Sequence, residues 1–347
     1  MIKSFIDRVL YLGYVLLTTF RHRKKLFIFS RYYGHKYSKS YLFFLRNAYV
    51  YYLKYDMHPL DYFYYNVYED KGFDQAEHAN TLFMYRYHRK MNDRKSVNYF
   101  HNKMLFHKRF KNYMGHDFIA LKEVDVLKLT EWFFAHKATK FIMKRMKSVG
   151  GFGVKKIVAD IIDGKLFINN KPIKQQLNYL KNFDMIEEYV EQHELLDKLN
   201  PSCLNTVRIV TVLDGHQNVN IIGAVIRLGV NNDVDNFHSG GIAVNIDVQT
   251  GKMCGNGFRL APSDNVFFDR HPVTNIVFDG YQLPNWDILI EAVKNAALVI
   301  PEARTIGWDV AIIDSGVSLI EGNHDWDKII IEKALKRGIR EQLKSYI

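Results

Sequence analysis

Residues 307 to 323 read Gly307-Trp308-Asp309-Val310-Ala311-Ile312-Ile313-Asp314-Ser315-Gly316-Val317-Ser318-Leu319-Ile320-Glu321-Gly322-Asn323. Two apolar runs flank the polar segment 314–316, and a three-residue loop ending in glycine is a known hairpin connection. The segment therefore predicts a β-hairpin. With this turn, Ile313 pairs with Val317, and Asp309 pairs with Glu321.

The hairpin also predicts a cluster of oxygen ligands. Side chains alternate along a strand, so Glu321 and Asn323 share a face, and Asp309 lies opposite Glu321. Two carboxylates and a carboxamide suit Mg²⁺, which prefers a few carboxylates together with substrate phosphates. The alternative is a hairpin end with solvated acids, because Asp is common in turns.

The composition is that of a globular chain with a sizeable core. Its 347 residues are 48% hydrophobic, which suffices for one large domain or for two to three smaller ones. The net charge of +11 and a pI near 9.3 favour anionic partners such as nucleotides, acidic saccharides or an anionic membrane surface. No stretch resembles a DNA- or RNA-binding motif, so we expect no nucleic acid partner. Cys203 and Cys254 form no disulfide or zinc pattern, and such thiols are typical of a reducing cytoplasm.

The first 95 residues predict a helical region that is rich in tyrosine and phenylalanine, with apolar residues at three- and four-residue spacings. Aromatic stripes are typical of a core; a platform for an acceptor sugar is the alternative. Residues 9–20 are apolar, and the basic residues 21–25 follow. The apolar run is too short to span a bilayer and has no cleavage site of a signal peptide. A helix over residues 2–20 is either a core helix or, within residues 1–25, a peripheral contact with the inner membrane leaflet.

The rest of the chain predicts short strands and helices. We expect helices over residues 98–110, 125–136, 173–182, 286–300 and 327–344. We expect strands over residues 118–121, 140–146, 154–161, 165–168, 185–190, 206–213, 220–228 and 241–248.

A glycine-rich loop, residues 147–153, joins two of these strands. Its backbone N–H groups can cradle phosphates, and Lys144 on the preceding strand can reach the same phosphates. No helix follows, so the loop is neither a Walker A motif nor a dinucleotide-binding fingerprint. A simple glycine hairpin is the alternative.

Polar residues within the other strands suggest further contacts. Residues 187–190 can offer backbone groups to an adenine edge, and Glu194 can offer a carboxylate to ribose hydroxyls; an acidic strand end is the alternative. Arg208 and Arg227 lie in apolar strands, where each requires an anion, although a core salt bridge would also satisfy them. Residues 235–241 are polar with two glycines, which suits a loop that approaches a ligand.

Along the chain, the strand lysine, the glycine-rich loop, the acidic strand end, the two arginines and the hairpin acids follow one another. This order resembles the ATP-grasp superfamily, whose metal site is an Asp on one strand and Glu-x-Asn on the next. More narrowly, roughly residues 95–335 resemble the sugar-transfer-associated ATP-grasp family. The resemblance is carried by residues 199–208, Asp235-Asn236 with Gly240-Gly241, His271-Pro272 with Phe278-x-Gly280, Gly307-Trp308-Asp309 and Ile320-Glu321-Gly322-Asn323. Within the first 95 residues, only the His58-Pro59 stretch looks like this family.

The resemblance implies an α+β ATP-grasp fold, in which two α+β subdomains grip ATP between antiparallel sheets. It divides the chain into the helical, aromatic-rich region 1–95, the N-terminal part of the core 96–139, the small lid subdomain 140–185 with the glycine loop, and the large subdomain 186–347 with the metal site and the C-terminal helix.

The resemblance also implies a role for each matching residue. ATP would be bound by Lys103, Lys144, Ser148, Gly150, Gly151, Gly153, Glu187, Glu188, Tyr189, Val190 and Glu194. Two Mg²⁺ ions would be held by Asp309, Glu321 and Asn323. The transferring phosphoryl group would be stabilised by Arg208, Arg227 and Asn236. The acceptor would lie near His238, Ser239, Gly240 and Gly241. Arg145 stands where better-known ATP-grasp ligases have proline, which changes the expected loop geometry.

The implied activity is that of an ATP-dependent carboxylate–amine ligase that acts through an acyl-phosphate in surface polysaccharide biosynthesis. The expected partners are ATP, an acidic saccharide such as a hexuronic acid, a sugar nucleotide or a lipid-linked sugar, and an amino acid or amine. We expect it in the cytoplasm or at the inner face of the membrane. The alternatives are a kinase of the same fold that phosphorylates a saccharide hydroxyl, and a non-catalytic nucleotide- or sugar-binding partner of a polysaccharide assembly complex.

Overall fold

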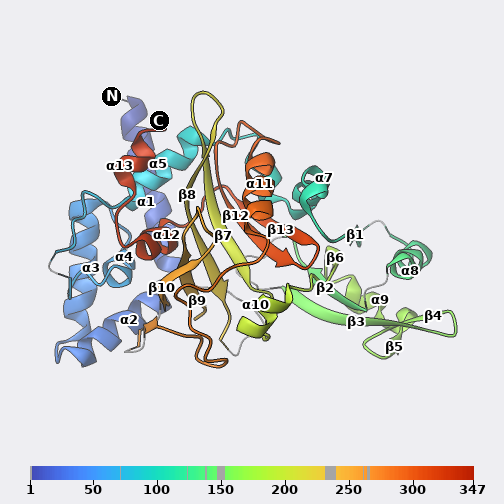
Figure 1. The fold of residues 1–347 in the computed structure, drawn as a ribbon. Helices are drawn as coiled ribbons and strands as arrows, with labels where there is room; N and C mark the ends of the chain where they lie inside the picture. Colours follow the sequence, from blue (N-terminus) through green and yellow to red (C-terminus); the bar gives the residue numbers. More distant parts are fainter. Residues whose placement is uncertain are drawn as a thin grey trace.

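Two antiparallel sheets and a layer of N-terminal helices build the protein (Figure 1). The computed structural model describes residues 2–70, 72–122, 124–136, 139–146, 153–230, 240–260, 262–263 and 266–347, with the backbone alone for residues 2–8. The expected α+β fold class is confirmed. The division of the chain at residues 95, 139 and 185 stays a prediction.

The larger sheet has seven strands in the order β11-β10-β9-β8-β7-β12-β13. In chain order they are β7 (Thr206–Leu213), β8 (Val219–Leu228), β9 (Ile242–Ile246), β10 (Met253–Phe258), β11 (Phe267–Phe268), β12 (Thr305–Ile313) and β13 (Gly316–Asn323). Helix α11 (Trp286–Ala297) covers one face with apolar side chains. The other face is covered in part by α12 (Lys328–Leu335) and by N-terminal helices.

The smaller sheet has the order β1-β6-β2-β3-β4-β5. Its strands are β1 (Phe118–Ala120), β2 (Lys140–Lys144), β3 (Val154–Ile162), β4 (Lys165–Ile168), β5 (Lys171–Pro172) and β6 (Met185–Glu188). Helices α8 (Val126–Ala135) and α9 (Ile173–Leu180) pack on it through a separate apolar cluster. The short helices α6 (Asn98–His101), α7 (Lys103–Arg109) and η1 (Lys111–Tyr113) lead into this sheet, and α10 (Glu194–Leu199) leads from it to the larger one.

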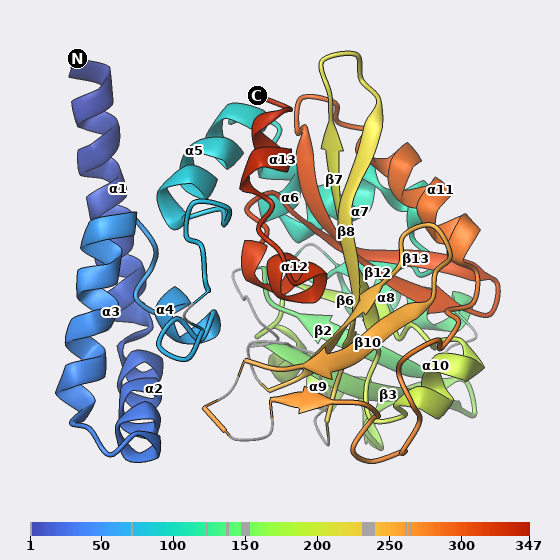
Figure 2. The ribbon, with the colours of Figure 1, turned by 60° about the vertical axis from the view of Figure 1, so that its left-hand side comes forward.

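The N-terminal region consists of α1 (Ile2–Arg21), α2 (Arg23–Lys36), α3 (Tyr41–Tyr55), α4 (Asp61–Tyr64) and α5 (Thr81–Met91). Figure 2 shows α1, α2 and α3 as an outer layer, with α4 and α5 between them and the larger sheet. The expected aromatic core is present, because Phe29, Tyr33, Phe44 and Phe63 pack together and join the apolar cluster that contains α12. No helix among the described residues is both long and apolar enough to cross a membrane.

The register of the β12–β13 hairpin differs from the prediction at its turn. Ile313 pairs with Gly316 rather than with Val317, so the turn has two residues, Asp314 and Ser315. This register alone would place Asp309 opposite Ile320. A β-bulge shifts the pairing beside Val310, and Asp309 therefore lies opposite Glu321 as expected.

The expected single helix over residues 327–344 is wrong. Helix α12 ends at Leu335, the next residue Lys336 has the left-handed φ of 52°, and α13 (Arg340–Lys344) begins after the turn. The turn is set by packing, since a Cβ at Gly338 would lie 2.1 Å from the backbone oxygen of Glu77. The helix expected over residues 98–110 is likewise two helices. Strand β10 was absent from the prediction, and its central Gly255-Asn256-Gly257 explains why the pattern was weak.

Buried charges fasten the N-terminal helices to α12. The Lys328 ammonium donates to Asp61 at 2.8 Å, and both side chains are almost fully buried. One helical turn further along α12, the Glu332 carboxylate accepts from the Tyr65 hydroxyl and, at 2.8 Å, from the Ala79 backbone N–H. Because each charge has a partner, the interface tolerates their burial.

We predict that Lys328→Met lowers the free energy of unfolding by about 3–5 kcal/mol, because it leaves the Asp61 carboxylate buried without its ammonium. Urea denaturation followed by circular dichroism measures the change. The exposed pair Lys344–Glu341 is the control, and Lys344→Met should change the same quantity by less than about 1 kcal/mol. Equal effects of the two substitutions would contradict the assigned role of the buried pair.

Candidate active site

Asp309 is the centre of the candidate site on the larger sheet. Its carboxylate is 1% exposed and accepts from Arg208 Nε at one oxygen and from Arg208 Nη2 at 2.9 Å at the other. Arg227 Nη2 lies 2.9 Å from Asp309 Oδ2. Burial alone would raise the pKa of Asp309, but Arg208 and Arg227 outweigh it and hold the pKa at about 2.

Glu321 and Asn323 complete this cluster from the neighbouring strand. Asn323 Nδ2 lies 3.3 Å from Glu321 Oε1 and 3.4 Å from the Gly307 carbonyl oxygen. Burial and the nearby Asp309 raise the pKa of Glu321, in the opposite direction to that of Asp309. The two carboxyls occupy paired positions on β12 and β13, so the charge of each disfavours the charge of the other.

Two glycines allow the strands that carry this cluster to pack closely. A Cβ at Gly307 would lie 2.7 Å from the Trp326 side chain, and a Cβ at Gly322 would lie 2.8 Å from the Phe100 ring. Trp308, which lies between Gly307 and Asp309 on β12, is fully buried and donates to Thr211 Oγ1 at 2.9 Å. The small residues on either side of the acids therefore have a packing explanation.

A buried amide network fixes the start of β7 and hence the position of Arg208. Asn200 Nδ2 donates to Asn205 Oδ1 at 2.8 Å, and the Asn205 side chain and backbone N–H both donate to Gln192 Oε1 at 2.9 Å. Gln192 Nε2 in turn donates to the Asn200 carbonyl at 3.0 Å. The motif 199–208 thus holds the strand through satisfied amides, a role that its sequence did not reveal.

A second buried cluster lies on the smaller sheet. Lys144 forms an ion pair with Glu187, whose carboxylate also lies 3.4 Å from His107 Nε2 and 3.9 Å from His116 Nε2. Burial would raise the pKa of Glu187, but the Lys144 ammonium outweighs it and holds the pKa below its ordinary value. Burial lowers the pKa of His107 to about 3, so this imidazole is neutral.

The two histidines are part of the cluster that sequence reasoning missed. Side-chain atoms of His107, His116 and Glu187 lie within 4.8 Å of one another, a spacing that suits a metal ion. The Lys144 ammonium already neutralises this carboxylate, and Glu187 Oε2, which faces the imidazoles, forms no hydrogen bond within the described residues. The spacing of His107 four residues after Lys103 on α7 was the available signal.

Lys103 lies between the two clusters. Asn102 caps α7 by accepting from the N–H groups of Met104 and Leu105, which places Lys103 in the first turn. Burial lowers the pKa of Lys103, Glu321 and Glu187 raise it, and Lys144 lowers it. These opposing influences mean that its ammonium is near the acids of both sheets.

Other predicted residues lie apart from these clusters. Glu188 accepts from the Asp117 N–H at 2.8 Å, and the Tyr189 ring lies 4.4 Å from Lys156 Nζ. Glu194 is exposed, pairs with Lys198 at 3.3 Å, and lies at the tip of the β12–β13 hairpin beside Asp314. Val190 is buried. The predicted ligands that lie outside the described residues are Ser148, Gly150, Gly151, Asn236, His238 and Ser239.

The described glycines of the predicted loops lie at their ends. Gly153, with φ of 81°, precedes β3, and Gly240, with φ of 100°, precedes the buried Gly241 and β9. His271 is fully buried, and its Nε2 donates at 3.0 Å to the carbonyl of Gly229, the residue that follows β8. The His271-Pro272 motif therefore holds the end of β8, just after Arg227.

The residues on β12 and β13 fit a divalent cation. A carboxylate offers about four acceptor positions. At Asp309, Arg208 and Arg227 take three, which leaves one position. A cation beside Glu321 and Asn323 would take that position, and oxygen ligands of this kind suit Mg²⁺.

The sequence matches the family described as sugar-transfer associated ATP-grasp over residues 82–346. Similar solved structures include N5-carboxyaminoimidazole synthetase from Staphylococcus aureus with ADP, at 9% identity and a TM-score of 0.41, covering 69% of this chain and 48% of that one. Biotin carboxylase from Campylobacter jejuni has 10% identity, a TM-score of 0.44, and coverages of 73% and 47%. The ATP-grasp ligase PsnB with Mg and ADP has 10% identity and a TM-score of 0.40, and the match covers 76% of this chain and 65% of that one. The chain thus spans about half of the first two proteins. A search of the curated proteins finds no match.

We predict that Lys144→Met lowers the free energy of unfolding near pH 7 by about 3 kcal/mol, because Glu187 loses its ammonium partner. In the wild type, the lowered pKa of Glu187 means that its contribution is present above its unfolded pKa and is lost as the pH falls through the folded value. In the variant, burial raises that pKa, so acidification should restore stability.

The double variant Lys144→Met/Glu187→Gln is the matched control. Its urea midpoint near pH 7 should exceed that of Lys144→Met and should show no gain on acidification. A single variant that is as stable as the wild type would disprove the assigned ion pair.

Proposed function

Because the chain belongs to the sugar-transfer associated ATP-grasp family, we propose that it is an ATP-dependent ligase that joins a carboxylate to an amine. The observation that carries this proposal is the convergence of Arg208 and Arg227 with Asp309, Glu321 and Asn323 on one face of the larger sheet. Cations for a transferring phosphoryl group and oxygen ligands for a metal stand together there.

ATP would extend from the smaller sheet to this face. Its base would meet Glu187 and the backbone of residues 188–190, and its ribose would meet Glu194 near the hairpin tip. Asp314, beside Glu194, lies five residues from Asp309 along β12, or about 17 Å. That separation suits an elongated nucleotide with its base at one end and its phosphates at the other. Lys103, Lys144 and the loop with Ser148, Gly150, Gly151 and Gly153 would contact the phosphates.

The phosphates would bring Mg²⁺, and the residues that would hold it are Asp309, Glu321 and Asn323. When bound, such ions would neutralise phosphate charge. Arg208 and Arg227 would hold the γ-phosphoryl oxygens in the same site. Asn236 is proposed for the same role.

The proposed reaction has two steps. An oxygen of the acceptor carboxylate attacks the γ-phosphorus, the bond to the β-phosphate oxygen breaks, and ADP leaves. The amine nitrogen then attacks the acyl-phosphate carbon, phosphate leaves, and the nitrogen loses a proton to give the amide. The chain contributes position and fixed positive charge, with both guanidiniums already aligned by Asp309 before substrates bind.

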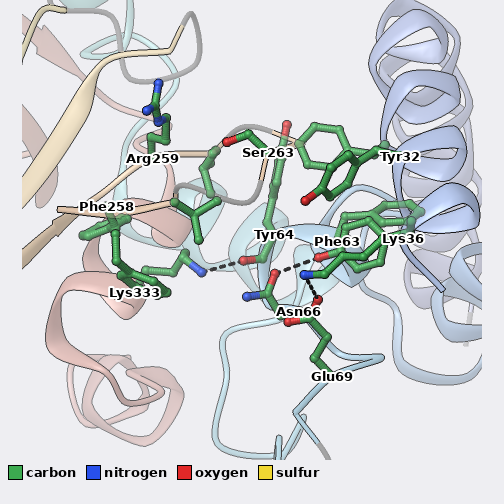
Figure 3. A pocket seen from close by; sticks show the side chains of 15 residues that line it. Tyr32, Lys36, Phe63, Tyr64, Asn66, Glu69, Phe258, Arg259, Ser263 and Lys333 are labelled. Atoms are coloured by element: carbon green, nitrogen blue, oxygen red, sulfur yellow. Dashed lines mark hydrogen bonds and ion pairs between the residues drawn. The ribbon is translucent and has the colours of Figure 1, made fainter. Parts of the chain in front are cut away.

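We propose a pocket between the N-terminal helices and the larger sheet as the place where the acceptor saccharide binds (Figure 3). It is lined by aromatic rings such as Tyr32, Phe63 and Phe258. Arg227 pairs with Ala243, and Ala243 pairs with Phe258, so the pocket begins on the same face, about 10 Å from Arg227.

Lys333 gives this pocket a preference for an acid. Its ammonium donates to the Tyr64 carbonyl at 2.8 Å, and no carboxylate of the described residues lies within ion-pair distance. Burial lowers the pKa of Lys333 to about 8, so an anionic ligand would be its natural partner. Aromatic faces with a buried cation suit a hexuronic acid of a surface polysaccharide.

We predict that Glu321→Gln lowers the turnover of ATP roughly 10²–10³-fold while the fold persists, because it removes a carboxylate from the metal site. ADP release with ATP, Mg²⁺ and a panel of uronic acids and amines measures this. Asp287→Asn, on the exposed face of α11, is the control and should leave turnover unchanged.

The mass of the product distinguishes the reaction types. An amide, formed with release of phosphate, supports the ligase. A phosphorylated saccharide without free phosphate would instead identify a kinase, and unchanged turnover in Glu321→Gln would overturn the proposed site.

We predict that Lys333→Met raises the KM for an acidic saccharide about tenfold or more, because it removes a charge-assisted contact, and leaves the KM for ATP unchanged. Steady-state kinetics with each substrate varied in turn measures both constants. Lys294→Met, on the exposed face of α11, should change neither KM. An unchanged saccharide KM in Lys333→Met would place the acceptor elsewhere.

A further inference from the structure

The positive charge of this protein is concentrated in its first three helices. Residues 1–55 contain 11 Lys and Arg and one acid, Asp7, whereas the other 292 residues contain 37 Lys and Arg and 36 Asp and Glu. Residues 1–55, less than a sixth of the chain, therefore carry +10 of the net charge of +11. The nucleotide site does not account for this excess, because it lies in the part that is nearly neutral.

The same helices expose an unusual amount of apolar surface. Of 28 exposed large hydrophobic side chains in the described residues, 15 lie between Val9 and Leu53. The most exposed are Leu16 and Leu17 at 71%, Phe20 at 66% and Leu53 at 76%. Single exposed leucines are ordinary, but a concentration of this size marks an interaction surface.

Helix α1 illustrates how this surface arises. Tyr11, Val15 and Thr19 follow one another at four-residue spacing and are the buried stripe of the helix. Tyr11 and Val15 pack with Leu82 of α5. The remaining faces carry Leu16, Leu17 and Phe20, so the helix is apolar on its outer side as well as on its inner side.

The exposed side chains of the three helices form one surface. The Phe27 ring of α2 contacts the Tyr41 ring of α3, with centroids 5.5 Å apart. Arg23 lies over the Phe20 ring at 4.2 Å and joins the end of α1 to the start of α2. Figure 2 shows these helices as the outer layer of the molecule, on the side away from the smaller sheet.

The cations of this surface lie beside its apolar residues. On α2, Lys24, Phe27, Ile28 and Arg31 are exposed at helical spacing. On α3, Leu42, Tyr49, Val50 and Leu53 are exposed, with Arg46 among them. Apolar side chains with neighbouring Lys and Arg suit the boundary between acyl chains and anionic headgroups.

We infer that the outer face of α1, α2 and α3 binds the surface of a lipid bilayer that contains anionic lipids. The leucines and aromatic rings enter the headgroup boundary, and Arg21, Arg23, Lys24 and Arg31 contact phosphate groups. A second copy of this chain is a poor occupant of the same face, because self-association would bring ten excess positive charges against ten. The inference rests on this surface and is independent of the reaction.

Co-sedimentation of the full chain with two kinds of vesicle tests the inference. The chain should bind vesicles of equal parts phosphatidylcholine and phosphatidylglycerol, bind vesicles of phosphatidylcholine alone at least tenfold more weakly, and lose affinity as salt rises. Failure to bind the anionic vesicles, or equal binding to both kinds, would overturn it.

Two sets of variants separate the apolar contribution from the charge. Leu16→Ser/Leu17→Ser should lower the partition coefficient about tenfold or more, whereas Leu127→Ser on α8, at 69% exposure, should not change it. Arg21→Gln/Arg23→Gln/Lys24→Gln should lower it about 100-fold, whereas the exposed Lys165→Gln/Lys171→Gln/Lys174→Gln of β4, β5 and α9 should not.

The oligomeric state and the fold of each variant complete the test. Sedimentation velocity of the wild type should show a monomer. A dimer that Leu16→Ser/Leu17→Ser abolishes, in a protein that does not bind vesicles, would identify a second copy as the occupant of this surface. Retained circular dichroism and retained ATP binding in the variants support the inference by showing that the substitutions act on the surface alone. Variants that bind vesicles as well as the wild type would contradict it.

Discussion

The contact between Asp309 and two arginines is the constraint on which the larger sheet depends. Arg208 and Arg227 lie within apolar strands, where an unpaired guanidinium would be costly. Asp309 neutralises them from the adjacent strand, and the strands can pack only because this pairing is satisfied. The salt bridge and the proposed active site are therefore the same group of atoms, and the two interpretations of the arginines are compatible.

The sequence predicted the members of this group but not the geometry that joins them. Apolar runs identified β7, β8, β12 and β13, and the acids on the hairpin were paired correctly. The turn was predicted one residue too long, and the pairing of Asp309 with Glu321 survives because a β-bulge compensates for that difference. A bulge depends on packing from both faces, here the aromatic residues around Gly322 and Gly307, and short-range patterns do not contain that information.

Long-range contacts also explain what sequence reasoning missed. The break between α12 and α13 follows from the approach of Glu77, more than 200 residues away, to Gly338. His107 and His116 acquire their role only when α7 and the start of β1 meet Glu187 on β6. By contrast, α1 and α8 were predicted closely, because the apolar spacing of both helices and the Asp125 cap of α8 are local. The N-terminal charge was visible throughout, but its meaning required the exposed face on which the structure places it.

The two buried carboxylates show how substrate binding changes the balance of charge in the site. Glu187 is neutralised by Lys144, and Asp309 by Arg208 and Arg227, so cations that would contact phosphates are engaged with the chain's own acids. Phosphate oxygens that approach these cations compete with the carboxylates for the same donors. A carboxylate released in this way gains negative charge that a divalent cation can neutralise, and Asp309 and Glu321 lie together where that charge would appear. By linkage, whatever binds the arginines also favours metal at the hairpin, and the reverse holds to the same extent. In the proposed site, nucleotide and metal would therefore be mutually dependent ligands, because one acid would serve both functions.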